Sequence, residues 1–274
     1  MPDHPIRLIA TDLDGTLLDS RGIIPDRNIR AIRAARERGV AVAVATGRFP
    51  ENAYLKMEDF GLRCPVIGVN GARTLDENLR QLTEHVMDPA AAERVLETVL
   101  SFGAECFMFA HRAICTCREG GQHHSELSQK SRVEAMGFTY YHGIREARMM
   151  ASKPVHKFYI RNSVPLTSVR EALEQIPDIQ ITQSGECNIE VMPKGIDKGL
   201  GIREYAGILG VPMDCVMALG DECNDIPMLE AAGWSVAMGN ACPAARDAAR
   251  FVTGTNDQCG FAQAVERLVL GGAP

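Results

Sequence analysis

The chain has 274 residues, a length typical of two domains or one large domain. Hydrophobic residues make up 46% and charged residues 23%, which is typical of a soluble globular protein that buries a core without disulfides. The formal net charge of −6 gives no general attraction for nucleic acid or an anionic membrane, so an anionic substrate needs a local site.

Short apolar runs alternate with helical patterns in the first part of the chain. The pattern predicts strands over 6–10, 40–45 and 65–69 and helices over 25–39 and 51–60. The apolar runs are nearly unbroken and end at polar residues and glycines, as strands buried on both faces of a parallel sheet do. Strand, helix, strand, helix, strand is typical of a doubly wound, Rossmann-like α/β fold.

The rhythm changes in the middle of the chain, where the glycine after each strand is missing. The pattern there predicts helices over 89–102, 125–136 and 166–176 and strands over 104–110, 113–117, 155–161 and 179–183. The buried pattern resumes with a helix over 198–209 and strands over 215–219, 235–238 and 251–253. We therefore expect a catalytic core formed by 1–84 and 187–274, with an α/β domain over 85–186 inserted into it.

Nine cysteines are scattered along the chain without a CxxC pair. This favours free thiols in a reducing compartment over a disulfide framework or a zinc site. The N-terminal residues are not a secretory signal, and no apolar run reaches membrane-spanning length. We expect a cytoplasmic protein, with monomer and homodimer both open.

Four polar clusters follow the predicted strands of the core or open its helix. They are 12–16, 46–48, Lys198 and 220–225. Ligands of an open parallel sheet bind beyond the carboxyl ends of its strands, so we expect the clusters to converge. One pocket would then hold four carboxylates, those of Asp12, Asp14, Asp221 and Asp225.

Such a pocket requires a cation. Two like charges about 4 Å apart repel by roughly 4 kcal/mol at an effective dielectric of 20. Magnesium prefers hard oxygen ligands, Lys198 supplies a second positive charge, and Thr46 offers a hydrogen bond to phosphate. These groups suit phosphoryl transfer, in which one aspartate attacks in line and a second carboxylate moves the proton.

The four clusters and three shorter stretches also match motifs of a known family. Four stretches occur in the order of the four motifs that define this family. They are 12–18 (DLDGTLL), 46–48 (TGR), 198–199 (KG) and 220–225 (GDECND). In this respect the chain resembles the haloacid dehalogenase (HAD) superfamily. Residues 70–72, 193–199 and 238–241 narrow the resemblance to its Cof-type group, subfamily IIB.

The resemblance implies a Mg²⁺-dependent phosphatase that hydrolyses small phosphate monoesters, sugar phosphates among them, through an aspartyl-phosphate on Asp12. It implies acid/base catalysis by Asp14, whose backbone carbonyl also faces the metal. The implied metal ligands are Asp12, Asp14, Asp221 and Asp225. The groups implied to bind or orient the phosphate are the Leu13 backbone, Thr46, Gly47, Lys198 and Asn224. The inserted domain would be a cap that selects the leaving group.

Alternatives remain at this stage. A phosphotransferase or phosphomutase would form the same intermediate, and a non-catalytic phosphate sensor would use the same pocket. Each acidic cluster alone is also explained by a turn or a helix cap, and a single lysine by an exposed surface position. In the inserted domain the polar residues near strand ends are either substrate contacts or simply exposed, and they are His111, Arg112, His156 and Lys157.

Overall fold

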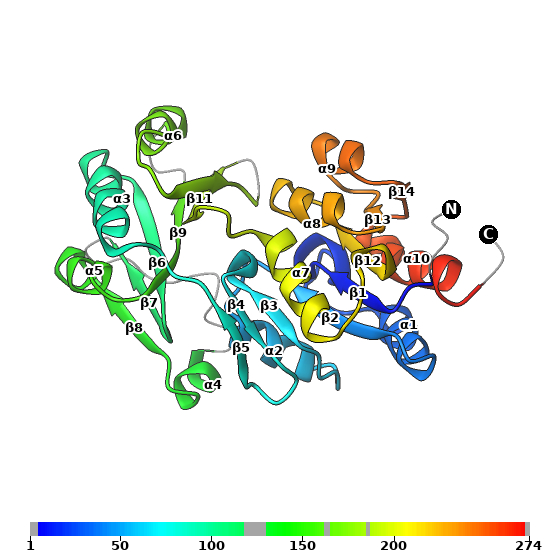
Figure 1. Ribbon diagram of the computed structural model, residues 1–274. Helices are drawn as coiled ribbons and strands as arrows, with labels where there is room; N and C mark the ends of the chain where they lie inside the picture. Colours follow the sequence, from blue (N-terminus) through cyan, green and yellow to red (C-terminus); the bar gives the residue numbers. More distant parts are fainter. Residues whose placement is uncertain (1–4, 118–129, 162–164, 185–186, 272–274) are drawn as a thin grey trace. The chain divides into compact units, whose positions relative to one another are not determined.

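The computed structural model describes residues 5–117, 130–161, 165–184 and 187–271. It divides the chain into two compact units, Met1–Thr83 with Asp197–Pro274 and Glu84–Ile196 (Figure 1). The second division was expected at 186/187 and lies at 196/197, because strand β11 (Asn188–Pro193) pairs with strands of the inserted unit.

The first unit contains an eight-stranded sheet with β1 near its middle. In spatial order its strands are β14 (Phe251–Val252), β13 (Trp234–Ala237), β12 (Val216–Gly220), β1 (Leu8–Thr11), β2 (Ala41–Ala45), β3 (Val66–Gly68), β4 (Arg73–Leu75) and β5 (Gln81–Glu84). Neighbours from β14 to β3 are parallel, and β4 is antiparallel to β3. The predicted α/β class with a parallel core sheet is confirmed.

Helices cover both faces of this sheet because successive strand residues point to opposite sides. Ile9 packs into a core with helices α1 (Asp26–Glu37), α2 (Pro50–Glu58) and α10 (Gly260–Leu268). Leu8 and Ala10 pack into the other core, with α7 (Lys198–Ile208), α8 (Ile226–Ala231) and α9 (Pro243–Ala248). Short helical turns η1 (Leu13–Leu17), η2 (Val69–Gly71), η4 (Met213–Cys215), η5 (Cys223–Asp225) and η6 (Asn256–Gln258) connect these elements.

The second unit has its own six-stranded sheet. Its order is β10 (Ile179–Thr182), β11, β9 (Val155–Arg161), β6 (Glu105–Ala110), β7 (Ala113–Thr116) and β8 (Thr139–His142), of which only the β7–β8 pair is parallel among the described residues. Helices α3 (Pro89–Ser101), α5 (Ile144–Ala151) and α6 (Leu166–Leu173) share one hydrophobic core with it. Of the predicted helix over 125–136, α4 (Lys130–Ala135) forms the described part, and 118–129 lie outside the described residues.

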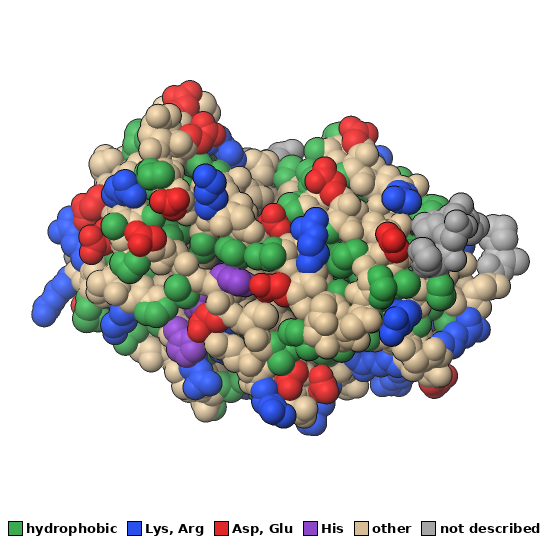
Figure 2. Space-filling view, viewed as in Figure 1, with side chains coloured by type: hydrophobic (Ala, Val, Ile, Leu, Met, Phe, Trp, Pro, Cys, Tyr) green, Lys and Arg blue, Asp and Glu red, His purple; other side chains and the backbone are tan. Residues whose placement is uncertain are grey.

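All nine cysteines are free thiols, as predicted. Within the described ranges, none of the helices combines the length and the apolar character needed to cross a membrane. On the face drawn in Figure 2, acidic and basic side chains are interspersed.

A buried ion pair joins α2 to β4 in the first unit. Nη1 of Arg73 lies 2.6 Å from Oε1 of Glu51, and the two side chains are 2% and 5% exposed. Nε of Arg73 also donates to Oε1 of Gln81, 3.0 Å away. Breaking a buried pair leaves an uncompensated charge in the protein interior, whereas an exposed pair contributes little.

We predict that Arg73→Met lowers the free energy of unfolding of this unit by about 3 kcal/mol, measured by urea denaturation. The control is Arg27→Met, which removes the exposed pair with Glu266, whose side chain is 38% exposed, and should cost less than about 1 kcal/mol. Equal losses in the two variants would contradict the assignment of this stability to burial of the Arg73 pair.

Candidate active site

The first polar cluster begins where β1 ends. Asp12 follows Thr11 directly, and its backbone N–H donates to the carbonyl of Leu219 on the neighbouring strand β12. The chain then turns through η1, where Gly15 has a φ of +78°. A Cβ atom on Gly15 would collide with the carboxylate of Asp221. Glycine is required here both for the turn and for the close approach of the fourth cluster.

Lys198 connects three distant parts of the sequence. It is the first residue of α7, and its Nζ lies 2.6 Å from Oδ1 of Asp12 and 2.6 Å from Oδ1 of Asp225. The lysine side chain is 1% exposed, so its charge has been taken out of water. Such burial is tolerated because the ammonium group is bonded to two carboxylates.

The fourth cluster is fixed by its own backbone. Oδ2 of Asp225 accepts the N–H groups of Asp221 at 2.8 Å and of Glu222 at 2.9 Å. The Asp221 carboxylate accepts from Thr16 Oγ1 at 2.7 Å and from Asn240 Nδ2 at 3.3 Å. These bonds hold the loop after β12 against the turn after β1.

Three of the four predicted acidic side chains come together, and their donor set fits a divalent cation. Oxygens of Asp12, Asp221 and Asp225 all lie within 4.8 Å of one another, and all three residues are buried. When ionised they carry three negative charges against the one positive charge of Lys198. The two remaining charges match a doubly charged ion, and carboxylate oxygens are the ligands that Mg²⁺ prefers.

The pKa shifts in the cluster reflect the same imbalance. Burial raises the pKa of the Asp12 carboxyl well above its ordinary value, Lys198 opposes this rise, and the neighbouring carboxylates add to it. Burial and the charge of Asp225 raise the pKa of Asp221 to about 7. Burial lowers the pKa of Lys198, but the attraction of Asp12 and Asp225 raises it by more than burial lowers it. The net pKa is therefore raised, and the ammonium keeps its proton.

The Asp14 side chain points elsewhere. Its two oxygens accept from Nε of Arg48 at 2.7 Å and from Nη2 at 2.6 Å, and it is 53% exposed. The expected four-carboxylate pocket therefore consists of three carboxylates, with Asp14 at the solvent-exposed side of η1.

The remaining predicted residues lie in the same unit. Thr46 follows β2 and is 1% exposed, and its Oγ1 accepts the backbone N–H of Arg48 at 3.2 Å. Gly47 is half-buried beside it. Nδ2 of Asn224 donates to Oδ1 of Asn70 at 3.2 Å. The Leu13 side chain is fully buried, so only its backbone is available to a ligand.

Three contacts around the aspartates were not assigned from the sequence. Arg48 holds Asp14, while Thr16 and Asn240 hold Asp221. All three lie inside the quoted motif stretches, so their positions carried a signal, but their partners depend on tertiary structure. In the inserted unit, His156 and Lys157 are buried, which contradicts the alternative of exposed strand ends for these two.

The chain is similar to known phosphatases along nearly its whole length. A family model described as haloacid dehalogenase-like hydrolase matches residues 9–265. The phosphatase YwpJ of Bacillus subtilis is 32% identical over 96% of this chain and 100% of its own length. The 5-amino-6-(5-phospho-D-ribitylamino)uracil phosphatase YcsE of the same organism is 29% identical over 98% of each chain.

Solved structures show the same similarity to haloacid dehalogenase-like hydrolases. A haloacid dehalogenase-like hydrolase from B. subtilis has a TM-score of 0.84 and 29% identity, and the match covers 96% of this chain and 100% of that one. The subclass IIB sugar phosphatase BT4131 has a TM-score of 0.80 and 25% identity, with 95% and 98% coverage. This chain belongs to the haloacid dehalogenase-like hydrolase family, in its Cof-type group, and is a phosphoric monoester hydrolase.

Proposed function

We propose that this chain hydrolyses small phosphate monoesters with Mg²⁺, through an aspartyl-phosphate on Asp12. The observation that carries the proposal is the buried cluster of Asp12, Asp221 and Asp225, with the Lys198 ammonium bonded to two of them. A purely structural ion pair does not require a third buried carboxylate. A site that brings a metal ion and a phosphoryl group together does.

Each side chain has a role in this chemistry. Asp12, Asp221 and Asp225, with the backbone carbonyl of Asp14, would hold Mg²⁺, which would supply positive charge to the phosphoryl oxygens. Lys198 orients the Asp12 carboxylate through Oδ1 and supplies further positive charge. The remaining contacts to the phosphate come from Thr46, Gly47, the Leu13 backbone and Asn224.

The reaction has two displacements on phosphorus. In the first, an oxygen of Asp12 bonds to phosphorus while the ester bond breaks, and Asp14 gives a proton to the leaving oxygen. In the second, a water bonds to phosphorus, Asp14 takes its proton, and the bond to Asp12 breaks. Asp14 suits this role because its side chain is half-exposed on the turn that follows Asp12. Its carboxylate can exchange the hydrogen bonds from Arg48 for one to the leaving oxygen of the substrate.

The substrate class is a small phosphorylated metabolite, with sugar phosphates the first candidates. The relative BT4131 is described as a sugar phosphatase, and YbhA of Escherichia coli as a pyridoxal phosphate phosphatase at 28% identity. We assign the role of the cap, which selects the leaving group, to the unit Glu84–Ile196. The free cysteines support a reducing location such as the cytoplasm.

We predict that Asp12→Asn lowers kcat for p-nitrophenyl phosphate in the presence of Mg²⁺ by at least about 10³-fold, because the nucleophile is lost. Circular dichroism checks that the fold is kept. The control Asp26→Asn removes an exposed acid at the start of α1 and should leave kcat unchanged. Turnover that survives in Asp12→Asn would rule out the covalent intermediate.

Lys194 and Lys198 both lie in the motif stretch 193–199 and provide a matched pair of substitutions. Lys198→Met removes the ammonium between Asp12 and Asp225, and we expect kcat/KM to fall by about 10²–10³-fold. Lys194→Met removes an exposed lysine four positions earlier and should leave kcat/KM unchanged. A comparable loss in both variants, measured with p-nitrophenyl phosphate, is the outcome that speaks against Lys198 as the catalytic lysine.

Metal dependence is tested on Asp221. Chelation should abolish phosphate release and added Mg²⁺ should restore it. Asp221→Asn removes one ligand, so we expect the Mg²⁺ concentration for half-maximal activity to rise at least about tenfold. An unchanged Mg²⁺ requirement in this variant would place the ion elsewhere.

A further inference from the structure

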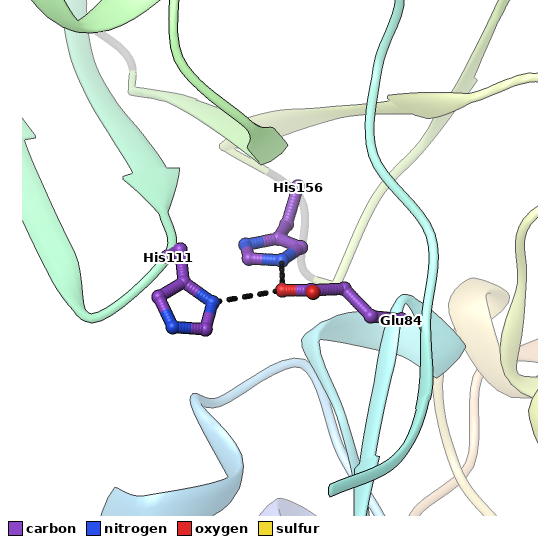
Figure 3. Close-up of side chains that lie close together, drawn as sticks. All are labelled: Glu84, His111 and His156. Atoms are coloured by element: carbon purple, nitrogen blue, oxygen red, sulfur yellow. Dashed lines mark hydrogen bonds and ion pairs between the residues drawn. The ribbon is translucent and has the colours of Figure 1, made fainter.

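A second group of metal-ligating side chains lies away from the aspartates, inside the unit Glu84–Ile196. Oε1 of Glu84 lies 2.9 Å from Nδ1 of His111 and 2.9 Å from Nε2 of His156 (Figure 3). The three donor atoms all lie within 4.8 Å of one another. Two imidazole rings from different parts of the chain thus converge on one carboxylate oxygen.

Three separate elements bring these residues together. Glu84 is the last residue of β5, where the chain enters this unit. His111 lies in the short turn between β6 and β7, and His156 lies on β9. None of the three pairs is close in sequence, so the cluster is a product of the tertiary fold.

His156 reaches the cluster through an irregularity in the sheet. Between β6 and β9, Phe109 pairs with Lys157 and the next residue, Ala110, pairs with Val155. His156 is therefore an extra residue with no partner in the register, which is a β-bulge. Bulges re-aim a side chain and are frequent beside functional sites. Here the bulge coincides with the residue that faces Glu84.

The second nitrogen of the buried His156 ring is not used in a hydrogen bond among the described residues. Its side chain is 0% exposed, and Nδ1 has no hydrogen-bond partner within the described part of the chain. A histidine that is buried only for structure normally uses both ring nitrogens. Among the described residues, this ring forms a hydrogen bond only through Nε2, the nitrogen that faces Glu84.

The spacing of the donor atoms is close to that of a zinc site. Ligand atoms sit about 2.0–2.1 Å from a tetrahedral zinc ion, and hence about 3.3 Å from one another. The two separations of 2.9 Å would have to open by only a few tenths of an ångström. Two histidines and one glutamate are also a known ligand set for zinc with an open fourth position.

We propose that Glu84, His111 and His156 form a binding site for a divalent transition metal ion, represented by Zn²⁺. The side chains of His111 and Glu84 are 45% and 26% exposed, which gives the ion a path from solvent and leaves a fourth position for water. Figure 2 shows histidine side chains beside acidic ones on the surface. Imidazole ligands disfavour Mg²⁺ at this site, so it is chemically distinct from the aspartate cluster.

Bound metal would tie Glu84 to the β6–β7 turn and to β9, all within the unit Glu84–Ile196. The ion would replace two hydrogen bonds with three coordinate bonds and so fix Glu84, the residue at which the chain enters the unit. The site shares no residue with the cluster proposed for phosphoryl transfer.

The test uses the untagged full-length protein, stripped with a chelator, loaded with Zn²⁺ in excess Mg²⁺ and desalted. Zinc per chain is measured by mass spectrometry of the elements. We expect wild type to retain about one zinc ion more than His111→Ala and Glu84→Gln, and the zinc Kd of each variant to rise at least about 100-fold. The control His142→Ala, an exposed histidine of the same unit, should retain as much zinc as wild type.

A competing site must be separated from this one. Cys223 Sγ and Cys242 Sγ lie 3.7 Å apart in the other unit, with Glu222 nearby. Substitution by Co²⁺ distinguishes them, because a thiolate ligand gives an intense charge-transfer band and a His–His–Glu site does not. Equal zinc in wild type, His111→Ala and Glu84→Gln, or a thiolate band that accounts for all bound cobalt, overturns the proposal. Circular dichroism confirms that both variants fold.

Discussion

The candidate site depends on one buried ammonium group held between two carboxylates. Lys198 bonds Asp12 and Asp225, and the lysine and the first aspartate are 186 positions apart in the sequence. Removing charges from water costs several kcal/mol per ion, and the cost is offset only where partners are placed accurately. The parallel pairing of β12 with β1 supplies that accuracy, because it sets the two acidic strand ends side by side where α7 begins.

The division into two units separates the residues proposed for phosphoryl transfer from the unit proposed to select the leaving group. Every residue proposed for phosphoryl transfer lies in Met1–Thr83 or Asp197–Pro274, and the inserted unit has a separate sheet and a separate hydrophobic core. Residues of the insertion can therefore change without disturbing the balance of charge around Lys198. Relatives that match nearly the whole chain carry names with different substrates, as we expect if the inserted unit selects the leaving group.

The sequence predicted the features that follow from burial and from chain order. An apolar run ending in Asp12 indicates a strand covered on both faces, and such a strand must deliver the aspartate to the edge where ligands bind. Features that depend on one specific contact were not predictable. The bond from Arg48 to Asp14 is of this kind, as is the place of β11 in the inserted sheet. The bulge at His156 leaves no trace in the alternation of residues along β9.

The two clusters of potential ligands also address a problem of metal selectivity. Divalent zinc binds most oxygen and nitrogen sites more tightly than magnesium does, so the carboxylates of Asp12, Asp221 and Asp225 alone do not exclude it. A site with two imidazoles is the better zinc ligand. If Glu84, His111 and His156 bind zinc as we propose, this ion binds first at their nitrogen donors. The carboxylate cluster would then remain available to Mg²⁺, which prefers oxygen ligands and whose two charges balance those that Lys198 leaves uncompensated.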